Sequence, residues 1–396
     1  MYNQPRARFV VPAAMAIMLT FGRAGMLPFE GVYTLLDRLM NYFVFFIAPI
    51  FALKDIYPRP KNQNLHLLMP LFLLIVWVTV CVVFGSSPEF WPNQTTLITI
   101  AISILMASQI TSFELRRVRH CILLLTGVFC INTLIFGQYS LNLIFSGALD
   151  YRLGNDLSPA NVIIFPRVMY MLIITCLISI MIEKKIWIKI TAAILIVLPL
   201  IIAIATGGRG PLVAAVVAIF TFILGFGNSK KIFYALIVAG LVSILGYDLV
   251  VRFFPLVQQR IIEGDDSGRF DIWTNLMDPN NISWFGQPLT GNYPHNIFLE
   301  MFFNYGLIGF CIFLLVLATT VKIAYTHYSF SRDLESLWVI SLLILQLTAQ
   351  QFSLDIFYGS LWAAMVLPIG CGWAYLKFSA SAVVNPLDNQ GRGYST

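Results

Sequence analysis

The stretch IWIKITAAILIVLPLIIAIATGGRGPLVAAVVAIFTFILGF, residues 186–226, decides the fold class of this chain. Its two apolar runs are long enough to cross about 30 Å of hydrocarbon, which takes about 17–25 helical residues. Only the short break at 206–210, which holds Arg209, separates them. Lipid offers the backbone no hydrogen-bond partners, so both runs should be helices. The stretch therefore predicts two consecutive membrane-spanning helices.

The same pattern recurs along the whole chain. Of 396 residues, 58% are hydrophobic and only 11% are charged, whereas a soluble domain carries about 25% charged residues. We therefore expect an all-α integral membrane protein of about 12 transmembrane helices, forming one polytopic domain over residues 1–378. A polar tail, 379–396, should be disordered. The expected spans are 10–27, 38–53, 65–84, 95–111, 120–136, 160–182, 186–206, 210–226, 232–251, 296–320, 334–351 and 355–376.

Basic residues set the expected orientation. Lys and Arg crowd the N-terminus, the connection after every second span and the start of the tail, and the positive-inside rule places that side in the cytoplasm. The net charge of +6 is thus assigned to orientation, and no nucleic acid partner is expected. The external connections include two long loops, 137–159 and 252–294. The residues that define the cytoplasmic side are Arg6, Arg8, Lys54, Arg59, Lys61, Arg116, Arg117, Arg119, Lys184, Lys185, Lys189, Lys230, Lys231, Lys322, Arg332 and Lys377.

A second group of arginines lies on the external side, against this bias. A guanidinium presents a planar fork of donors that matches phosphate or carboxylate oxygens, so an anionic ligand is one account of the group. Arg167, inside span 160–182 and directly after Pro166, is counted with them because an Arg in a span usually faces a cavity or a partner. Structural ion pairs with external Asp and Glu are the alternative. The external members are Arg152, Arg209, Arg252, Arg260 and Arg269.

His295 is the only one of the four histidines expected on the external side. It follows Pro294 and opens span 296–320, where unpaired N–H groups favour the neutral imidazole that a general base requires. A helix cap, with Asn296 beside it, is the alternative.

Metal chemistry has little support in the sequence. Asp265 and Asp266 form the one adjacent acidic pair weighed as a metal site, and their context EGDDSG is typical of a turn. The cysteines show no C-x-x-C pair and no Cys/His metal spacing, so free, buried thiols are expected. They are Cys81, Cys121, Cys130, Cys176, Cys311 and Cys371.

Four stretches together resemble the O-antigen polymerase and ligase superfamily, the Wzy-type polymerases and WaaL-type ligases. TGGRGPLVAA (206–215) is similar to the family's S/T-x-x-R-G stretch. SGRFDIWTNLM (267–277) is similar to its S-x-x-R-x-x-x-W element, but has one residue instead of two between Ser267 and Arg269. PHNIFLEMFFNYGLIGF (294–310) is similar to H-N-x-x-L-E-x-x-x-x-x-G-x-x-G. RLGNDLSPAN (152–161) resembles R-x-x-G…N-P-N, but has one residue instead of two between Arg152 and Gly154, and has Ser158-Pro159-Ala160-Asn161 in place of N-P-N. The repeated R-x10-G arrangement of some polymerases does not occur at Arg152, Arg252, Arg260 or Arg269.

The resemblance, which covers roughly residues 150–310, implies a GT-C-like glycosyltransferase of the bacterial inner membrane, with short helices in its periplasmic loops and no metal cofactor. It implies polymerisation of undecaprenyl-diphosphate-linked repeat units, with inversion at the anomeric carbon. His295 would be the catalytic base. The diphosphate and substrate would be bound by Arg209, Arg269, Arg152, Arg260, Arg252, Arg167 and Asn296.

Two other functions stay open. An O-antigen ligase would transfer the glycan from undecaprenyl diphosphate to lipid A–core by the same chemistry. A transporter of an anionic lipid-linked substrate would usually show paired broken helices, and no half-repeat is visible in the sequence. The expected partners are the lipid-linked donor, an acceptor glycan, membrane lipids and a chain-length regulator.

Overall fold

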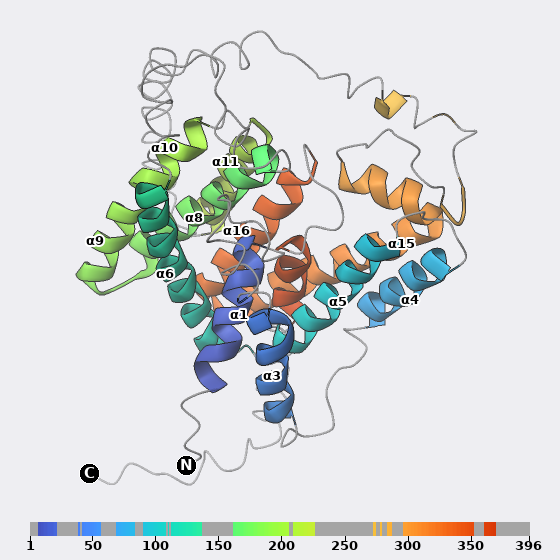
Figure 1. Ribbon diagram of the computed structural model, residues 1–396, viewed down its shortest axis with the longest axis horizontal. Coiled ribbons are helices and arrows are strands. Elements are labelled where there is room, and N and C mark those ends of the chain that lie inside the picture. Colours follow the sequence, from blue (N-terminus) through green and yellow to red (C-terminus); the bar gives the residue numbers. More distant parts are fainter. Residues whose placement is uncertain are drawn as a thin grey trace.

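The computed structural model describes residues 7–21, 39, 42–56, 69–83, 90–107, 110, 112–136, 161–205, 209–225, 272–274, 278, 283–286, 296–351 and 360–369. Nearly all residues in these ranges are helical, and none of them forms a strand (Figure 1). The all-α expectation is confirmed for this part of the chain. The expected span 232–251, the expected loop 137–159, most of the loop 252–294 and the tail 379–396 lie outside it.

A helix overlaps each of the remaining expected spans. The elements are α1 (Ala7–Phe21), the π-helix η1 (Phe43–Ile47) continued by α3 (Ala48–Ile56), α4 (Met69–Val83), α5 (Phe90–Ala107), α6 (Ser112–Phe136), α8 (Asn161–Ile182), α9 (Ile186–Leu195), α10 (Val197–Ala205), α11 (Arg209–Gly225), α15 (Ile297–Ser331), α16 (Leu334–Ala349) and a helix at Ser360–Ile369.

The expected span 186–206 is divided into α9 and α10. Pro199 has no N–H, and its ring would crowd the carbonyl of Leu195, so the helical ladder is interrupted between them. That carbonyl accepts a hydrogen bond from the Cys130 thiol instead, with Sγ and O 3.8 Å apart. The division is therefore a local proline effect inside one apolar run.

Two helical stretches in the described residues, Ile186–Ala203 and Ile297–Ser329, meet both the length and the hydropathy expected of a membrane span. Other apolar stretches in the described helices, among them Arg167–Ile182 and Gly210–Gly225, are 10–17 residues long. Large apolar side chains also stand exposed on α9, α10 and α11, among them Trp187, Ile194 and Val216. These features are consistent with a membrane protein, and about twelve spans remains a prediction.

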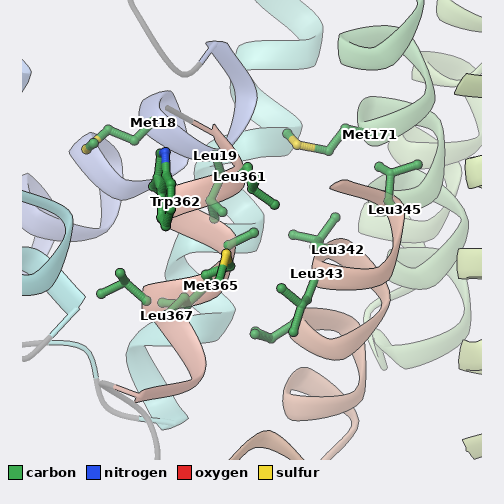
Figure 2. Packing of buried hydrophobic residues seen from close by; sticks show 14 of the residues in the cluster. Met18, Leu19, Met171, Leu342, Leu343, Leu345, Leu361, Trp362, Met365 and Leu367 are labelled. Atoms are coloured by element: carbon green, nitrogen blue, oxygen red, sulfur yellow. The ribbon is translucent and has the colours of Figure 1, made fainter. Parts of the chain in front are cut away.

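The core is centred on α16. Most of its side chains are buried, as expected of a helix that is apolar on all faces. Figure 2 shows Leu342, Leu343 and Leu345 of α16 with Met171 of α8 on one side and the helix at Ser360–Ile369, which carries Trp362, on the other. α11 packs along α16 and also contacts α8. This arrangement brings the ends of several helices together at two opposite ends of the bundle.

Contacts between helix ends fix the relative direction of the helices. At one end, here called the Glu183 end, Arg119 of α6 meets Glu183 after α8 and Glu335 at the start of α16. At the other, the Asn296 end, Arg167 near the start of α8 meets Gln346 near the end of α16. α8 and α16 are therefore antiparallel, as the alternating topology requires. By the positive-inside rule, the Glu183 end is the predicted cytoplasmic end.

Candidate functional site

Arg167 is buried at the Asn296 end. The residue is 1% exposed, and its Nη2 donates to the carbonyl of Gln346 at 3.1 Å. The same carbonyl accepts the backbone N–H of Gln350 at 3.1 Å, because Gln350 caps the C-terminus of α16. The negative end of a helix favours a cation. The guanidinium therefore stabilises the end of α16 from inside the bundle.

The Gln346 side chain extends this polar cluster to two further elements. Its Oε1 accepts from Ser360 Oγ at 3.3 Å, and its Nε2 lies 3.8 Å from the thioether sulfur of Met171. All of these side chains are buried. One glutamine thus joins α16 to α8 and to the helix at Ser360–Ile369.

The end of α16 also holds the start of α15. The carbonyl of Gln350 accepts the backbone N–H of Ile297 at 3.1 Å. Asn296 is the N-cap of α15, and its Oδ1 accepts from the N–H groups of Phe298 and Leu299 at 3.0 and 3.3 Å. Glu300 lies buried in the first helical turn, where the helix dipole favours an acidic residue. The beginning of α15 is therefore fixed by both its own cap and α16.

Two of the predicted site positions, Arg167 and Asn296, are connected through the end of α16. A continuous path runs from Arg167 to Gln346, along one turn of α16 to Gln350, and across to Ile297, which follows Asn296. Arg209 is the first residue of α11, as the break between the apolar runs predicts. The structure does not describe its side chain, so its predicted role stays a prediction. His295, Arg152, Arg252, Arg260 and Arg269 also lie outside the described residues, and their roles stay predictions.

The sequence did not predict Gln346, Gln350 or Ser360 as site residues. The signal for two of them was present, because glutamines four positions apart near the end of an apolar span lie on one face of a helix. Ser360 had no such signal, since its contact with Gln346 depends on how two helices pack. Asn296 was predicted to bind substrate, whereas the structure shows its carboxamide oxygen engaged as a helix cap.

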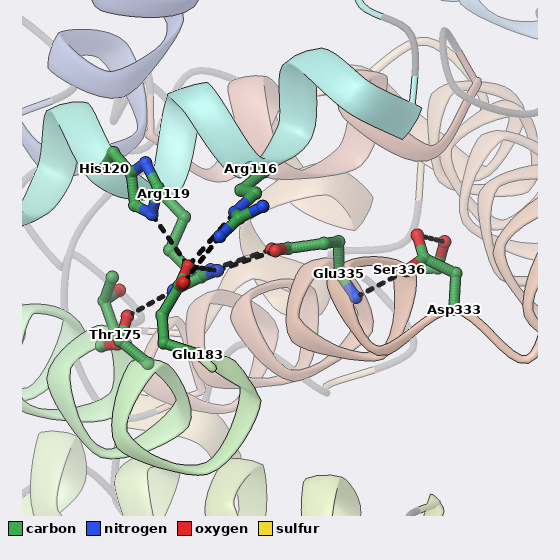
Figure 3. A network of polar contacts seen from close by, with 9 residues as sticks. Arg116, Arg119, His120, Thr175, Glu183, Asp333, Glu335 and Ser336 are labelled. Carbon is green, nitrogen blue, oxygen red and sulfur yellow. Dashed lines mark hydrogen bonds and ion pairs between the residues drawn. The ribbon is translucent and has the colours of Figure 1, made fainter. Parts of the chain in front are cut away.

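The Glu183 end contains a buried ion-pair network (Figure 3). Arg119 has no exposed side-chain surface and contacts Glu183 Oε1 at 2.6 Å and Glu335 Oε1 at 2.7 Å. Its Nη1 donates to Ser179 Oγ at 2.7 Å. Arg116 and His120 reach the same Glu183 carboxylate, each at 2.7 Å. From the sequence, Arg116 and Arg119 were predicted only to be orientation charges.

The electrostatics of Glu183 follow from this arrangement. Burial alone would raise the pKa of the carboxyl, but hydrogen bonds from Arg116, His120 and Arg119 outweigh burial and lower the pKa to about 2. Glu183 is therefore ionised throughout the physiological range. Its charge is directed inward, whereas the neighbouring Lys184 and Lys185 are exposed.

Metal ligands do not gather in the described part of the chain, where no group of three or more His, Cys, Asp or Glu could hold an ion. Asp265 and Asp266 lie outside the described residues. The five described cysteines are free, as expected. Burial is confirmed for Cys81, Cys130 and Cys176, whereas Cys121 is half-buried and Cys311 is exposed, so the expectation of buried thiols is wrong for Cys311.

The chain matches no protein-family model, no curated protein and no solved structure. The likeness to O-antigen polymerases and ligases therefore depends on the four sequence stretches alone.

Proposed function

We propose that the protein is a glycosyltransferase that polymerises undecaprenyl-diphosphate-linked oligosaccharide units. The observation that carries the proposal is the contact path from Arg167 through the end of α16 to Ile297. It joins a predicted arginine position to the helix start that directly follows His295. Polar residues buried at the end of a helical bundle are typical of a functional region in membrane proteins.

The proposed chemistry uses a general base and several cations. His295 would take the proton from the acceptor hydroxyl as that oxygen attacks the anomeric carbon of the donor. The bond from the anomeric carbon to the diphosphate oxygen breaks, and the electron pair leaves with undecaprenyl diphosphate. Arg209 and Arg269 would stabilise the negative charge that develops on this leaving group. A single displacement inverts the anomeric carbon and requires no metal.

The proposal includes a location. The Asn296 end would face the periplasm from the bacterial inner membrane, and the Glu183 end would face the cytoplasm. A GT-C-like arrangement of about 12 spans would leave the undecaprenyl chain in contact with lipid. A chain-length regulator would be a partner of such a polymerase. A ligase that uses lipid A–core as its acceptor is the alternative within the same chemistry.

A transporter is favoured by one feature, a break inside α15 at Gly306, because transporters bind substrates at discontinuous helices. The backbone groups at this break are, however, engaged by other parts of the protein: the N–H of Leu307 donates to the carbonyl of Ser283, and the carbonyl of Tyr305 accepts from Trp77. The glycosyltransferase is therefore the better-supported function.

The test is transfer by purified protein in lipid nanodiscs. The donor is an undecaprenyl-diphosphate-linked repeat unit, EDTA is present, and products are separated by size. A ladder of lipid-linked oligomers supports the polymerase, and a single addition to lipid A–core supports the ligase. Turnover that requires added Mg²⁺ or Mn²⁺ contradicts the metal-independent mechanism, and no transfer with any matched donor and acceptor contradicts the proposed function.

A further inference from the structure

α15 is interrupted inside its apolar length. Gly306 has φ 68° and ψ −177°, a backbone conformation outside the helical region, and helical geometry resumes at Leu307. The break lies nine positions after Ile297, which is about 14 Å along a helix. A break in a membrane span leaves N–H and C=O groups that lipid cannot satisfy, so it persists only where other groups engage them.

A short piece of the long loop supplies these partners. The carbonyls of Ser283 and Trp284 accept the N–H groups of Leu307 at 3.0 Å and Ile308 at 3.5 Å. On the other side of the break, the indole Nε1 of Trp77 in α4 donates to the carbonyl of Tyr305 at 2.9 Å. Residues 283–286, here called the clamp segment, thus bond to the backbone that the break exposes.

α4 holds the clamp segment from its other side. The Cys81 thiol donates to the carbonyl of Phe285 at 3.6 Å. The rings of Phe285 and Trp77 are stacked, with centroids 5.9 Å apart and planes at 25°. The backbone, more than the side chains, makes the contact with α15, because Trp284 is 64% exposed and Phe285 is 63% exposed.

Glycine is required on both sides of this contact. Gly306 and Gly286 have φ of 68° and 88°, which side-chain-bearing residues rarely adopt. A Cβ on Gly306 would overlap the carbonyl of Trp284, and a Cβ on Gly286 would overlap the carbonyl of Asn304. A Cβ on Gly309 would lie 3.0 Å from Trp77 Nε1. Two backbones approach one another here as closely as only glycine permits.

We propose that the clamp segment and the Gly306 break are a positioning device for the proposed active site. The loop 252–294 carries Arg252, Arg260 and Arg269 before the clamp segment, and it returns to His295 after it. Both the clamp segment and Asn296 are fixed to α15, at the break and at its first turn. The clamp therefore fixes to α15 one point of the loop that lies, in sequence, between the predicted arginines and the predicted base. Gly306 and Trp77 are positioning residues that touch no reacting atom.

This inference rests on the proposed function, but the clamp itself can be tested without any substrate. Hydrogen exchange of the protein in nanodiscs, read by mass spectrometry on peptides that contain Leu307 and Ile308, reports whether these N–H groups are bonded. Gly306→Ala should speed their exchange by roughly tenfold or more, because local opening exposes them. Gly127→Ala is the matched control, since Gly127 also lies within a helix but a Cβ there meets only Leu195 at 3.8 Å.

The positioning role is tested by turnover at saturating donor. Gly306→Ala should lower kcat by about 10²-fold, the loss typical of a small displacement of catalytic groups. Trp77→Phe removes the indole N–H but keeps a ring beside Phe285, so it should lower kcat in the same direction and by less. It also keeps the inference testable if Gly306→Ala does not fold. Gly127→Ala and Trp284→Ala, which leave the backbone contact intact, should stay within about 2-fold of wild type.

The outcomes separate the two proposals. Absence of transfer by the wild-type protein contradicts the proposed function, while the exchange measurement still decides whether the clamp exists. Unchanged exchange in both Gly306→Ala and Trp77→Phe overturns the clamp. Faster exchange with unchanged kcat at saturating donor overturns the positioning role.

Discussion

Arg119 and Glu335 form a buried, two-point ion pair across 216 positions of sequence. Nε donates to Oε2 at 2.8 Å and Nη2 to Oε1 at 2.7 Å, and the two side chains are 0% and 9% exposed. Paired hydrogen bonds of this kind are charge-assisted and directional. They join α6 to the start of α16, the helix at the centre of the core. The Glu183 end is therefore held by electrostatics that the charge count of the sequence does not reveal.

Removing Arg119 should destabilise the protein strongly. Arg119→Ala removes the cation that pairs with buried Glu335 and one of the three groups that bond buried Glu183, and breaking a buried pair costs about 3–5 kcal/mol. The control is Arg117→Ala, which removes a neighbouring and partly exposed arginine that lies over the Phe9 ring at 5.7 Å. Thermal unfolding in nanodiscs should show a much larger loss for Arg119→Ala. Equal losses in the two variants would contradict a structural role for the buried pair.

The stability that Glu183 contributes to the folded protein should decrease as the pH falls. The pKa of Glu183 is lowered to about 2 in the folded protein, below the value of about 4.3 expected in the unfolded chain. The ionised carboxylate therefore favours folding, and its contribution is fully present above about pH 5 and is lost as the pH falls towards 2. Glu183→Gln should be less stable than wild type at pH 7, and the difference in melting temperature should narrow between pH 5 and 3. A constant difference would show that the charge of Glu183 is not what stabilises this end.

The sequence predicted the helices well but not their partners. Apolar runs such as 186–206 and 334–351 determine where helices form. In lipid or in a packed core the backbone N–H and C=O groups have no water to bind, so they must bond to one another within a helix. The sequence could not predict that Arg119 pairs with Glu183 and Glu335. A sequence shows the sign of each charge but does not show which carboxylate an arginine contacts. Gly306 was quoted within a motif, but the reason for the glycine is the carbonyl of Trp284 in a different segment. Contacts between segments that are distant in sequence account for most of the features that the sequence did not predict.

The orientation predicted from basic residues can be tested by labelling. In a protein whose native cysteines are replaced, Ser267→Cys should react with a membrane-impermeant maleimide in intact spheroplasts. Lys184→Cys, at an exposed position of the Glu183 end, should react only after the membrane is opened. The positive-inside rule is the physical basis for both expectations. The reverse labelling pattern would place the Asn296 end in the cytoplasm and would remove the basis of the proposed periplasmic active site.

Arg167 has either a structural role or a substrate-binding role, and substitution can distinguish the two. Its guanidinium is buried and donates to the Gln346 carbonyl, and a hydrogen bond from a charged group contributes about 1.5–3 kcal/mol. Arg167→Ala should therefore lower the melting temperature, while the folded fraction should bind undecaprenyl-diphosphate-linked donor with near-normal affinity. Donor affinity that falls while the melting temperature is unchanged would instead support the diphosphate contact predicted from the sequence.

His295 and Asn296 are adjacent, yet their substitution should have separable effects. If His295 is the base, His295→Ala removes an interaction that acts only in the transition state. Single-turnover transfer should fall by about 10²–10⁴-fold, and donor binding should stay near wild type. Asn296→Ala removes the cap that accepts from Phe298 and Leu299, which should cost about 1 kcal/mol of stability and leave most of the turnover. Asn296→Ala is therefore the control for damage to the start of α15. Near-normal turnover in folded His295→Ala, or equal losses of turnover and stability in the two variants, would mean that His295 helps to begin a helix and is not the base.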